Sequence, residues 1–189
     1  MTSFKEECSE YIKTGQSLSK QEDKVNFYIK NFKECICNGG KIILCGNGGS
    51  AADSIHIAGE FVGRFKKDRK SLPAISLSAE VSSLTSIGND YGFEYIFSRQ
   101  IEGLGKRNDI LISLSTSGMS VNILKAVEIA NKKGLKTLSF SGKGGGCLAN
   151  ISNDCIVIES ETTARIQEAQ KFILHYICNK LEELLFDQN

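Results

Sequence analysis

Short, almost wholly apolar runs alternate with longer amphipathic stretches along most of the chain. The runs are predicted to be buried strands and cover residues 41–45, 74–77, 109–115, 136–140 and 155–158. Between them apolar residues recur at helical spacing, which predicts helices near residues 50–66, 79–88, 92–105 and 119–133 and a last helix from about 162 to 186. Strands that alternate with helices are typical of a parallel sheet covered on both faces.

The first 37 residues are predicted to be helical, with a break near Gly15. Their apolar positions follow helical spacing at Val25, Tyr28, Ile29, Phe32 and Ile36. The Asn-Gly-Gly sequence at 38–40 ends this segment. We therefore expect a single domain over residues 1–189, in which an N-terminal helical segment (1–38) precedes an α/β core and C-terminal helix (39–189).

The predicted fold class is α/β. It is a doubly wound, flavodoxin-like sandwich in which helices cover a five-stranded parallel sheet, with extra helices at the N-terminus. Such sheets bind ligands beyond the carboxyl ends of their strands. Three predicted strand ends are rich in small and polar residues, namely GNGGS after the first, STSGMS at the third and SGKGGG after the fourth. A binding site is expected at these loops.

Composition and charge are those of an ordinary globular protein. Hydrophobic residues make up 41% of the chain and charged residues 24%, and the net charge is +1. Because a nucleic-acid backbone requires clustered Lys and Arg, nucleic acid is not expected as a partner. The densest basic run, residues 64–70, is interpreted as a solvated helix end.

The cysteines and the N-terminus indicate in which cellular compartment the protein is found. Seven cysteines cannot form a complete set of intrachain disulfides, and without a C-x-x-C pair a zinc finger or thioredoxin-like site has little support. Cys45 and Cys155 fall in predicted strands and are expected to be small core residues. The N-terminus is unlike a signal peptide, and no apolar run approaches the ~20 residues of a membrane helix. These features predict a cytoplasmic protein that has no membrane partner.

The loop after the first strand, GNGGSAAD, has the composition of an anion-binding turn. Gly46, Gly48 and Gly49 allow the backbone to turn tightly, and Ser50 is expected to cap the following helix, whose N-terminus favours an anion. A dinucleotide is the nearest alternative ligand, but the G-x-G-x-x-A pattern that ends at Ala51 lacks a suitably placed acidic residue about 20 positions later. A glycine turn without a ligand is the third interpretation.

Four hydroxyl groups surround Gly118 in the loop after the third strand, from Ser115, Thr116, Ser117 and Ser120. Hydroxyls and backbone amides together can hold a phosphate without a lysine. Helix capping is the alternative, but a single cap accounts for only one hydroxyl. Because no Walker lysine follows either loop, a small phosphorylated metabolite is favoured over a nucleotide.

The two histidines lie on different predicted helices. His56 precedes Glu60 by four positions, so the two side chains can point at one atom; an exposed ion pair is the alternative. They flank an apolar stripe formed by Ala51, Ile55, Ala58, Val62 and Phe65.

His175 lies in KFILHYIC, which is apolar almost all round the helix, so it is expected to be buried in the domain or in a subunit interface. A buried histidine forms hydrogen bonds or binds a metal, and a satisfied core histidine is the alternative to a ligand. Gln167 lies eight positions earlier, roughly 12 Å along a helix. One straight helix can hardly bring both to the same ion, but a neighbouring chain could supply one of them.

Several of these segments occur together in one known family. GNGGSAAD with its histidine and glutamate, GNDYGFEYIFSRQ, STSGMS, SGKGGG and TARIQE with its histidine resemble the phosphoheptose isomerases, also called sedoheptulose 7-phosphate isomerases, of the sugar-isomerase (SIS) domain superfamily. The resemblance covers nearly the whole chain. The loops alone are typical of the superfamily, whereas a much more specific set is formed by His56, Glu60, Asn89, Asp90, Arg165, Ile166, Gln167 and His175.

The resemblance implies conversion of sedoheptulose 7-phosphate into D-glycero-D-manno-heptose 7-phosphate, which opens the pathway to activated heptoses of lipopolysaccharide or capsule. It also implies a homotetramer with active sites at subunit interfaces and one zinc ion per subunit. The hydroxyl loop would hold the phosphate. The implied zinc ligands are His56, Glu60, Gln167 and His175. The implied substrate positions are Asn47, Gly48, Gly49, Glu60, Asn89, Asp90, Ser115, Thr116, Ser117, Ser120 and Gln167.

Such an isomerase removes a proton from one carbon and returns it to the neighbouring carbon through an enediol, and a metal would stabilise the developing charge. We assign Glu60 as the base and His175 as its acid partner, although the two roles can be exchanged. Two positions depart from the family pattern. Ala164 stands where some members have an aspartate, so an acidic helper at this position is in doubt. Gln170 stands where a histidine is expected, and this change could alter the pocket's preference for its substrate.

Three other functions stay open at this point. A non-catalytic SIS tetramer, such as the scaffold that binds the bacterial replication initiator, has no need to retain His56, Glu60, Gln167 and His175 together. A phosphosugar-sensing regulatory module is often fused to a DNA-binding or kinase domain, for which 189 residues leave no room. An isomerase of a different phosphosugar fits the same residues.

Overall fold

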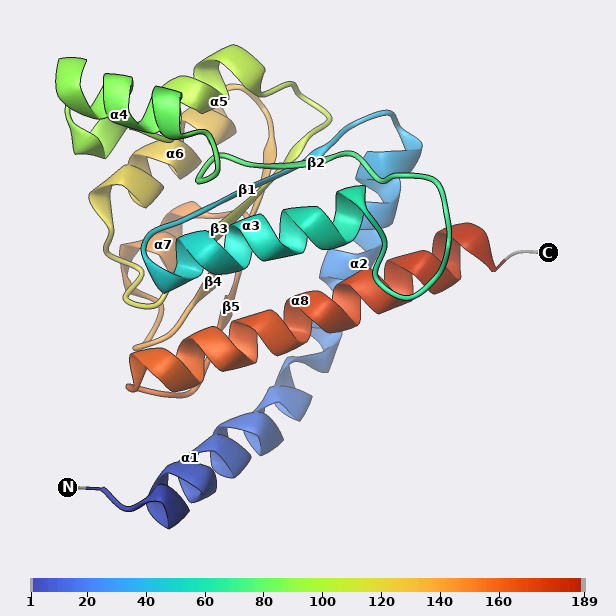
Figure 1. Cartoon of the computed structure of the whole chain (residues 1–189), viewed down its shortest axis with the longest axis vertical. Helices are drawn as coiled ribbons and strands as arrows, with labels where there is room; N and C mark the ends of the chain where they lie inside the picture. The colour runs from blue at the N-terminus through green and yellow to red at the C-terminus, as the bar shows by residue number, and fades with distance from the viewer. Residues whose placement is uncertain (1, 188–189) are drawn as a thin grey trace.

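The chain folds into three layers, with a central parallel sheet between two layers of helices (Figure 1). The computed structural model describes residues 2–187. The sheet has five strands in the order β2-β1-β3-β4-β5, and each neighbouring pair is parallel. This order confirms the predicted doubly wound, flavodoxin-like fold.

Each predicted strand is present to within one residue at either end. The strands are β1 (Ile42–Gly46), β2 (Ala74–Ser76), β3 (Ile110–Ser115), β4 (Lys136–Ser141) and β5 (Asp154–Val157). β1 and β3 are buried along their whole length, which explains why their sequences are continuous apolar runs. β2 lies at an edge of the sheet and is partly exposed.

The helices differ from their predicted ranges more than the strands do. They are α1 (Phe4–Ser17), α2 (Glu22–Cys37), α3 (Gly49–Val62), α4 (Val81–Asp90), α5 (Ser98–Leu104), α6 (Val121–Lys132), α7 (Gly146–Ile151) and α8 (Thr163–Phe186). The N-terminal break falls at a 3-10 turn, Leu18–Gln21, and Gly15 lies inside α1. There Leu18 enters the core, while α1 projects away from the body of the molecule (Figure 1). A second 3-10 turn, Phe93–Tyr95, interrupts the helix predicted for 92–105.

Two hydrophobic cores lie on opposite faces of the sheet. α2, α3 and α8 cover one face, where Tyr28 of α2 meets Phe140 of β4 edge to face at 5.4 Å between ring centroids. The Tyr28 hydroxyl donates a hydrogen bond to the Ser139 carbonyl at 2.9 Å. α5, α6 and α7 cover the other face, and α4 packs there through its partly buried Leu84 and Ile87. The first core therefore carries the helices of both histidines.

The apolar stripe predicted for α3 is rotated. Ile55 and Val62 are 43% and 49% exposed, whereas Ile57 and Phe61 are fully buried. The reason is that α3 packs against both the sheet and α8, so its buried face lies between these two contacts. α3 also ends at Val62, four residues earlier than predicted.

The basic run after α3 is not a solvated helix end. Residues 64–70 form a loop, and the Arg69 side chain is buried against Glu182 of α8. The sequence alone could not show this, because a charge run that faces water and one that contains a buried ion pair have the same composition.

All seven cysteines lie within the described residues and carry free thiols. Cys45 and Cys155 are buried as predicted, and burial raises the pKa of each thiol to about 12. Within residues 2–187, no helix combines the length and the apolar character that crossing a bilayer requires.

Replacement of Phe140 by alanine tests the first core. Because Phe140 is fully buried, Phe140→Ala is expected to lower the free energy of unfolding by about 3–5 kcal/mol, measured by urea denaturation. Phe140→Leu is the matched control and should cost clearly less, since leucine retains most of the apolar contact. Equal losses for the two variants would show that packing at this position does not support the fold as described.

Candidate active site

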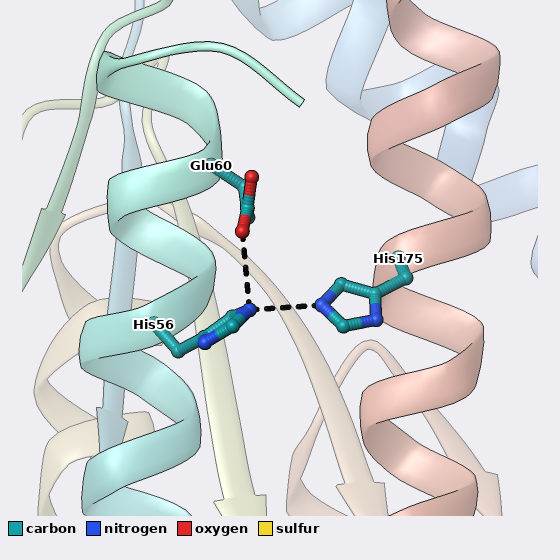
Figure 2. Close-up of side chains that lie close together, drawn as sticks. All are labelled: His56, Glu60 and His175. Carbon is teal, nitrogen blue, oxygen red and sulfur yellow. Dashed lines mark hydrogen bonds and ion pairs between the residues drawn. The ribbon is translucent and has the colours of Figure 1, made fainter. Parts of the chain in front are cut away.

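α3 and α8 run side by side on one face of the sheet and bring three predicted residues together (Figure 2). His56 and Glu60 stand one turn apart on α3, and His175 faces them from α8. His56 Nε2 lies 3.0 Å from His175 Nε2 and 3.1 Å from Glu60 Oε1. The predicted pairing of His56 with Glu60 is confirmed, and α8 adds a third side chain to it.

These three side chains form a donor set that fits a divalent metal ion. One nitrogen or oxygen from each lies within 4.8 Å of the others, and imidazole nitrogens and carboxylate oxygens are common zinc ligands. With bonds of about 2.0–2.1 Å in a tetrahedral site, ligand atoms stand about 3.3 Å apart. The distances of 3.0 and 3.1 Å are close to that spacing.

His175 is only partly buried within one chain, so the predicted full burial would need a subunit interface. The Phe65 ring stacks on the imidazole with 5.4 Å between centroids and 29° between planes. Burial lowers the pKa of His175 and the neighbouring His56 lowers it further, while Glu60 acts in the opposite direction. The neutral imidazole, which is the form that binds metal, is thereby favoured.

Gln167 is separated from the three-residue cluster within the single chain. It lies eight residues before His175 on the same helix, roughly 12 Å along the axis. Its amide instead packs against the glycine loop, where a Cβ atom at Gly49 would lie 2.7 Å from Gln167 Nε2. It therefore stays a prediction that Gln167 binds the ion from a second copy of the chain.

The glycine loop has the predicted backbone but a different helix cap. A Cβ atom at Gly46 would lie 2.5 Å from the Ser50 carbonyl oxygen, and Gly48 adopts φ 54°. Gly48 is the N-cap of α3, and Ser50, which lies within the first turn, does not cap the helix as predicted. Because no side chain among residues 2–187 caps this end, its amide groups can receive an anion.

The hydroxyl loop is likewise not explained by helix capping. Ser120 precedes α6, yet its side chain makes no cap hydrogen bond within the described part of the chain. Ser115 Oγ donates to Ser120 Oγ at 3.3 Å, and Ser117 Oγ accepts the backbone N–H of Met119 at 3.2 Å. The Ser115 and Ser120 hydroxyls thus meet at the end of β3, and Ser117 lies beside them in the same loop.

Glycine is required at the centre of this loop. Gly118 has φ 66°, and a Cβ atom there would lie 2.0 Å from the Gly145 carbonyl oxygen. The loops that follow β3 and β4 are therefore in direct contact, as expected for adjacent parallel strands.

Asn122, which was not among the predicted site residues, joins the first two loops through a pair of amides with Asn47. Asn47 Nδ2 donates to Asn122 Oδ1 at 2.9 Å, and Asn122 Nδ2 donates to Asn47 Oδ1 at 2.8 Å. Asn122 lies in the first turn of α6 and is 3% exposed. The pair spans the ends of β1 and β3, the topological switch point at which doubly wound sheets bind ligands. A lone asparagine in an amphipathic helix carries no pattern that would have marked it.

Asn89 and Asp90 do not reach the three-residue cluster within one chain. They are exposed at the end of α4, where Asn89 Nδ2 donates to Asp90 Oδ1 at 2.8 Å. α4 belongs to the core on the opposite face of the sheet from α3 and α8.

The departures noted in the sequence lie outside the cluster. Ala164 is exposed in the first turn of α8. Gln170 is fully buried, and neither of its amide atoms has a hydrogen-bond partner within residues 2–187.

Known proteins resemble this chain in both sequence and fold. Residues 4–142 match a family model described as SIS domain. The phosphoheptose isomerase of a Nitratiruptor species is 48% identical over 178 residues, which cover 92% of this chain and 95% of that protein. Phosphoheptose isomerase 1 of Campylobacter jejuni is 50% identical over 178 residues and 94% of each chain. The solved structure of phosphoheptose isomerase from Neisseria gonorrhoeae has a TM-score of 0.89 at 35% identity and covers 94% of this chain and 95% of that chain.

The lowered pKa of His175 can be measured directly by NMR titration of the metal-free protein. The chain has two histidines, and His175→Gln assigns their resonances. His175 is expected to titrate below the ordinary value of 6.5. Since the folded chain then binds fewer protons than the unfolded chain, this residue makes the fold less stable as the pH falls through that range. Titration of His175 at or above 6.5 would contradict the described surroundings.

Proposed function

The chain belongs to the SIS domain family and, within it, to the phosphoheptose isomerases, and on this premise we propose that it converts sedoheptulose 7-phosphate into D-glycero-D-manno-heptose 7-phosphate at the His56–Glu60–His175 cluster. It is an isomerase that acts on phosphosugars. The observation that carries the proposal is the meeting of two imidazoles and a carboxylate from α3 and α8. The scaffold role is not supported, because the relatives that match over nearly their whole length are isomerases by name.

We propose that the phosphate of the sugar binds at the hydroxyl loop. Support comes from the cluster of serine hydroxyls at the end of β3 and from the switch-point position that the loop shares with the glycine loop. The amide groups at the start of α3 add partial positive charge. The proposed contacts are Asn47, Gly48, Gly49, Ser115, Thr116, Ser117 and Ser120, with Glu60, Asn89, Asp90 and Gln167 toward the rest of the sugar.

We propose zinc as the ion and His56, Glu60 and His175 as three of its ligands, with Gln167 as the fourth. The donor set and its spacing support this choice. A divalent ion held by these residues would supply positive charge that stabilises the charge developing on the sugar oxygens.

Glu60 is the proposed base, and it takes the C1 proton of the ketose and returns it to C2. His175 is the proposed acid partner, which moves protons between the two oxygens as the carbonyl shifts from C2 to C1. Burial lowers the pKa of His175, which favours the neutral form of its imidazole. The two residues can exchange these roles.

We further propose that residues 1–189 act as one SIS domain in a cytoplasmic homotetramer with active sites between subunits. Within the described chain α4 buries none of its residues. A group of large apolar side chains is exposed on α1 and α8, namely Phe4, Tyr11, Ile12, Phe172 and Tyr176, as expected of an interaction surface. Contacts between subunits would also bring Gln167, Asn89 and Asp90 to the cluster.

Free thiols are consistent with a reducing compartment. The heptose product serves lipopolysaccharide or capsule synthesis.

Turnover of sedoheptulose 7-phosphate tests the function itself. The intact protein is expected to form the aldose phosphate, and His175→Gln is expected to reduce kcat by about 10²–10⁴-fold, the usual contribution of a positioned acid or base. Aldose formation is followed by enzymatic coupling or by NMR. If the intact protein does not turn over this sugar, the proposed substrate is wrong.

The origin of the transferred hydrogen tests the enediol route. In D₂O the product is expected to carry deuterium at C2, because a proton held on Glu60 can exchange with solvent. Mass spectrometry and NMR of the product measure this incorporation. Complete retention of the substrate hydrogen, as in a direct hydride shift, would exclude Glu60 as an exchanging base.

A further inference from the structure

The loop that follows α3 is held to the end of α8 by one buried carboxylate. Glu182 accepts the backbone N–H groups of Phe65, Lys66 and Lys67 at 2.8, 2.9 and 3.0 Å. Its Oε1 atom lies 3.0 Å from Arg69 Nε, and the two side chains are 1% and 2% exposed. Burial alone would raise the pKa of Glu182, but these donors outweigh it and the pKa is lowered. The carboxylate is therefore ionised and fully bonded, which offsets the cost of burying it.

Arg69 extends this bonding to the last turn of α3, which carries Glu60. Its guanidinium donates to the backbone carbonyls of Glu60, Phe61 and Gly63 at 2.8, 2.7 and 3.2 Å. Carbonyl groups in the last turn of a helix have no partners within the helix. Arg69 thus replaces the missing partners and ties this turn to Glu182 on α8.

The same pair is also connected to His175. Phe65, whose N–H group Glu182 accepts, stacks its ring on the His175 imidazole. Glu182 lies seven residues after His175, about two turns of α8. The Arg69–Glu182 pair therefore fixes the backbone of Glu60 and the residue, Phe65, whose ring stacks on His175.

We propose that Arg69 and Glu182 are positioning residues for the metal cluster, which hold Glu60 and His175 at the separation that an ion requires. The inference rests on the proposed function, because it takes the cluster to be the metal site. Within residues 2–187, the hydrogen bonds of both side chains go to backbone groups and to each other, and none goes to the imidazoles or the carboxylate of the cluster. Outer groups that orient ligands typically contribute 10- to 100-fold to metal affinity.

Asp109 provides a matched control at the other end of the sheet. It is 3% exposed, accepts the backbone N–H groups of Lys41 and Lys106 at 2.9 and 2.8 Å, and pairs with the Lys41 amine. It precedes β3 and lies away from the carboxyl ends of the strands. Asp109→Asn therefore removes a comparable buried charge without affecting α3 or α8.

The test compares the intact protein with Glu182→Gln, Arg69→Lys and Asp109→Asn. Zinc affinity is measured by competition with a chromophoric chelator, the visible spectrum of the Co²⁺-loaded protein reports ligand geometry, and urea denaturation gives stability. Glu182→Gln and Arg69→Lys are expected to weaken zinc binding by about 10- to 100-fold and to change the Co²⁺ spectrum. Lysine retains the charge of Arg69 but not its several fixed donors. Asp109→Asn should lose stability while binding zinc like the intact protein.

The inference is overturned if Arg69→Lys binds zinc with the affinity and Co²⁺ spectrum of the intact protein, which decides the matter even where Glu182→Gln fails to fold. It is also overturned if Asp109→Asn weakens zinc binding as much, or if the intact protein binds no zinc. Turnover of sedoheptulose 7-phosphate by the intact protein is measured separately. Normal zinc results without turnover would therefore refute the proposed substrate and leave the positioning role supported.

Discussion

The packing of α8 against α3 is the contact on which the site depends. His56 and Glu60 belong to one helix and His175 to the other, so neither helix alone holds the cluster. Residues of both helices share one core with the sheet, and close-packed interiors resist changes in helix separation. The 3.0 Å distance between His56 Nε2 and His175 Nε2 therefore depends on the packing of the whole helix layer.

The topology of the sheet places the other half of the site. With the strand order β2-β1-β3-β4-β5, the connections after β1 and β3 leave toward opposite faces, which opens a crevice between them. The glycine loop and the hydroxyl loop border this crevice and are joined by the reciprocal Asn47–Asn122 amide pair. α3 starts at the glycine loop and leads directly to His56 and Glu60. One helix therefore connects the proposed phosphate end of the substrate with its reactive end.

Local patterns were sufficient to predict the strands, because short, nearly continuous apolar runs such as KIILC and DILISLS are typical of strands buried on both faces of a parallel sheet. The His56–Glu60 pairing also followed from helical periodicity. The interaction of Arg69 with Glu182 could not be predicted, since the two residues are 113 positions apart and the basic run around Arg69 looks like any solvated segment. The end of α3 could not be predicted for the same reason. Its last carbonyl groups accept hydrogen bonds from Arg69, a side chain outside the helix. The association of α8 with α3 entered through the family resemblance rather than through any pattern in the residues.

X-ray absorption of the zinc-loaded protein is the most direct measurement of whether α3 and α8 share one ion. The account predicts a zinc ion bound only by nitrogen and oxygen, with scattering from two imidazole rings in the intact protein and from one in His175→Gln. Scattering from sulfur at about 2.3 Å, or from a single imidazole in the intact protein, would contradict it.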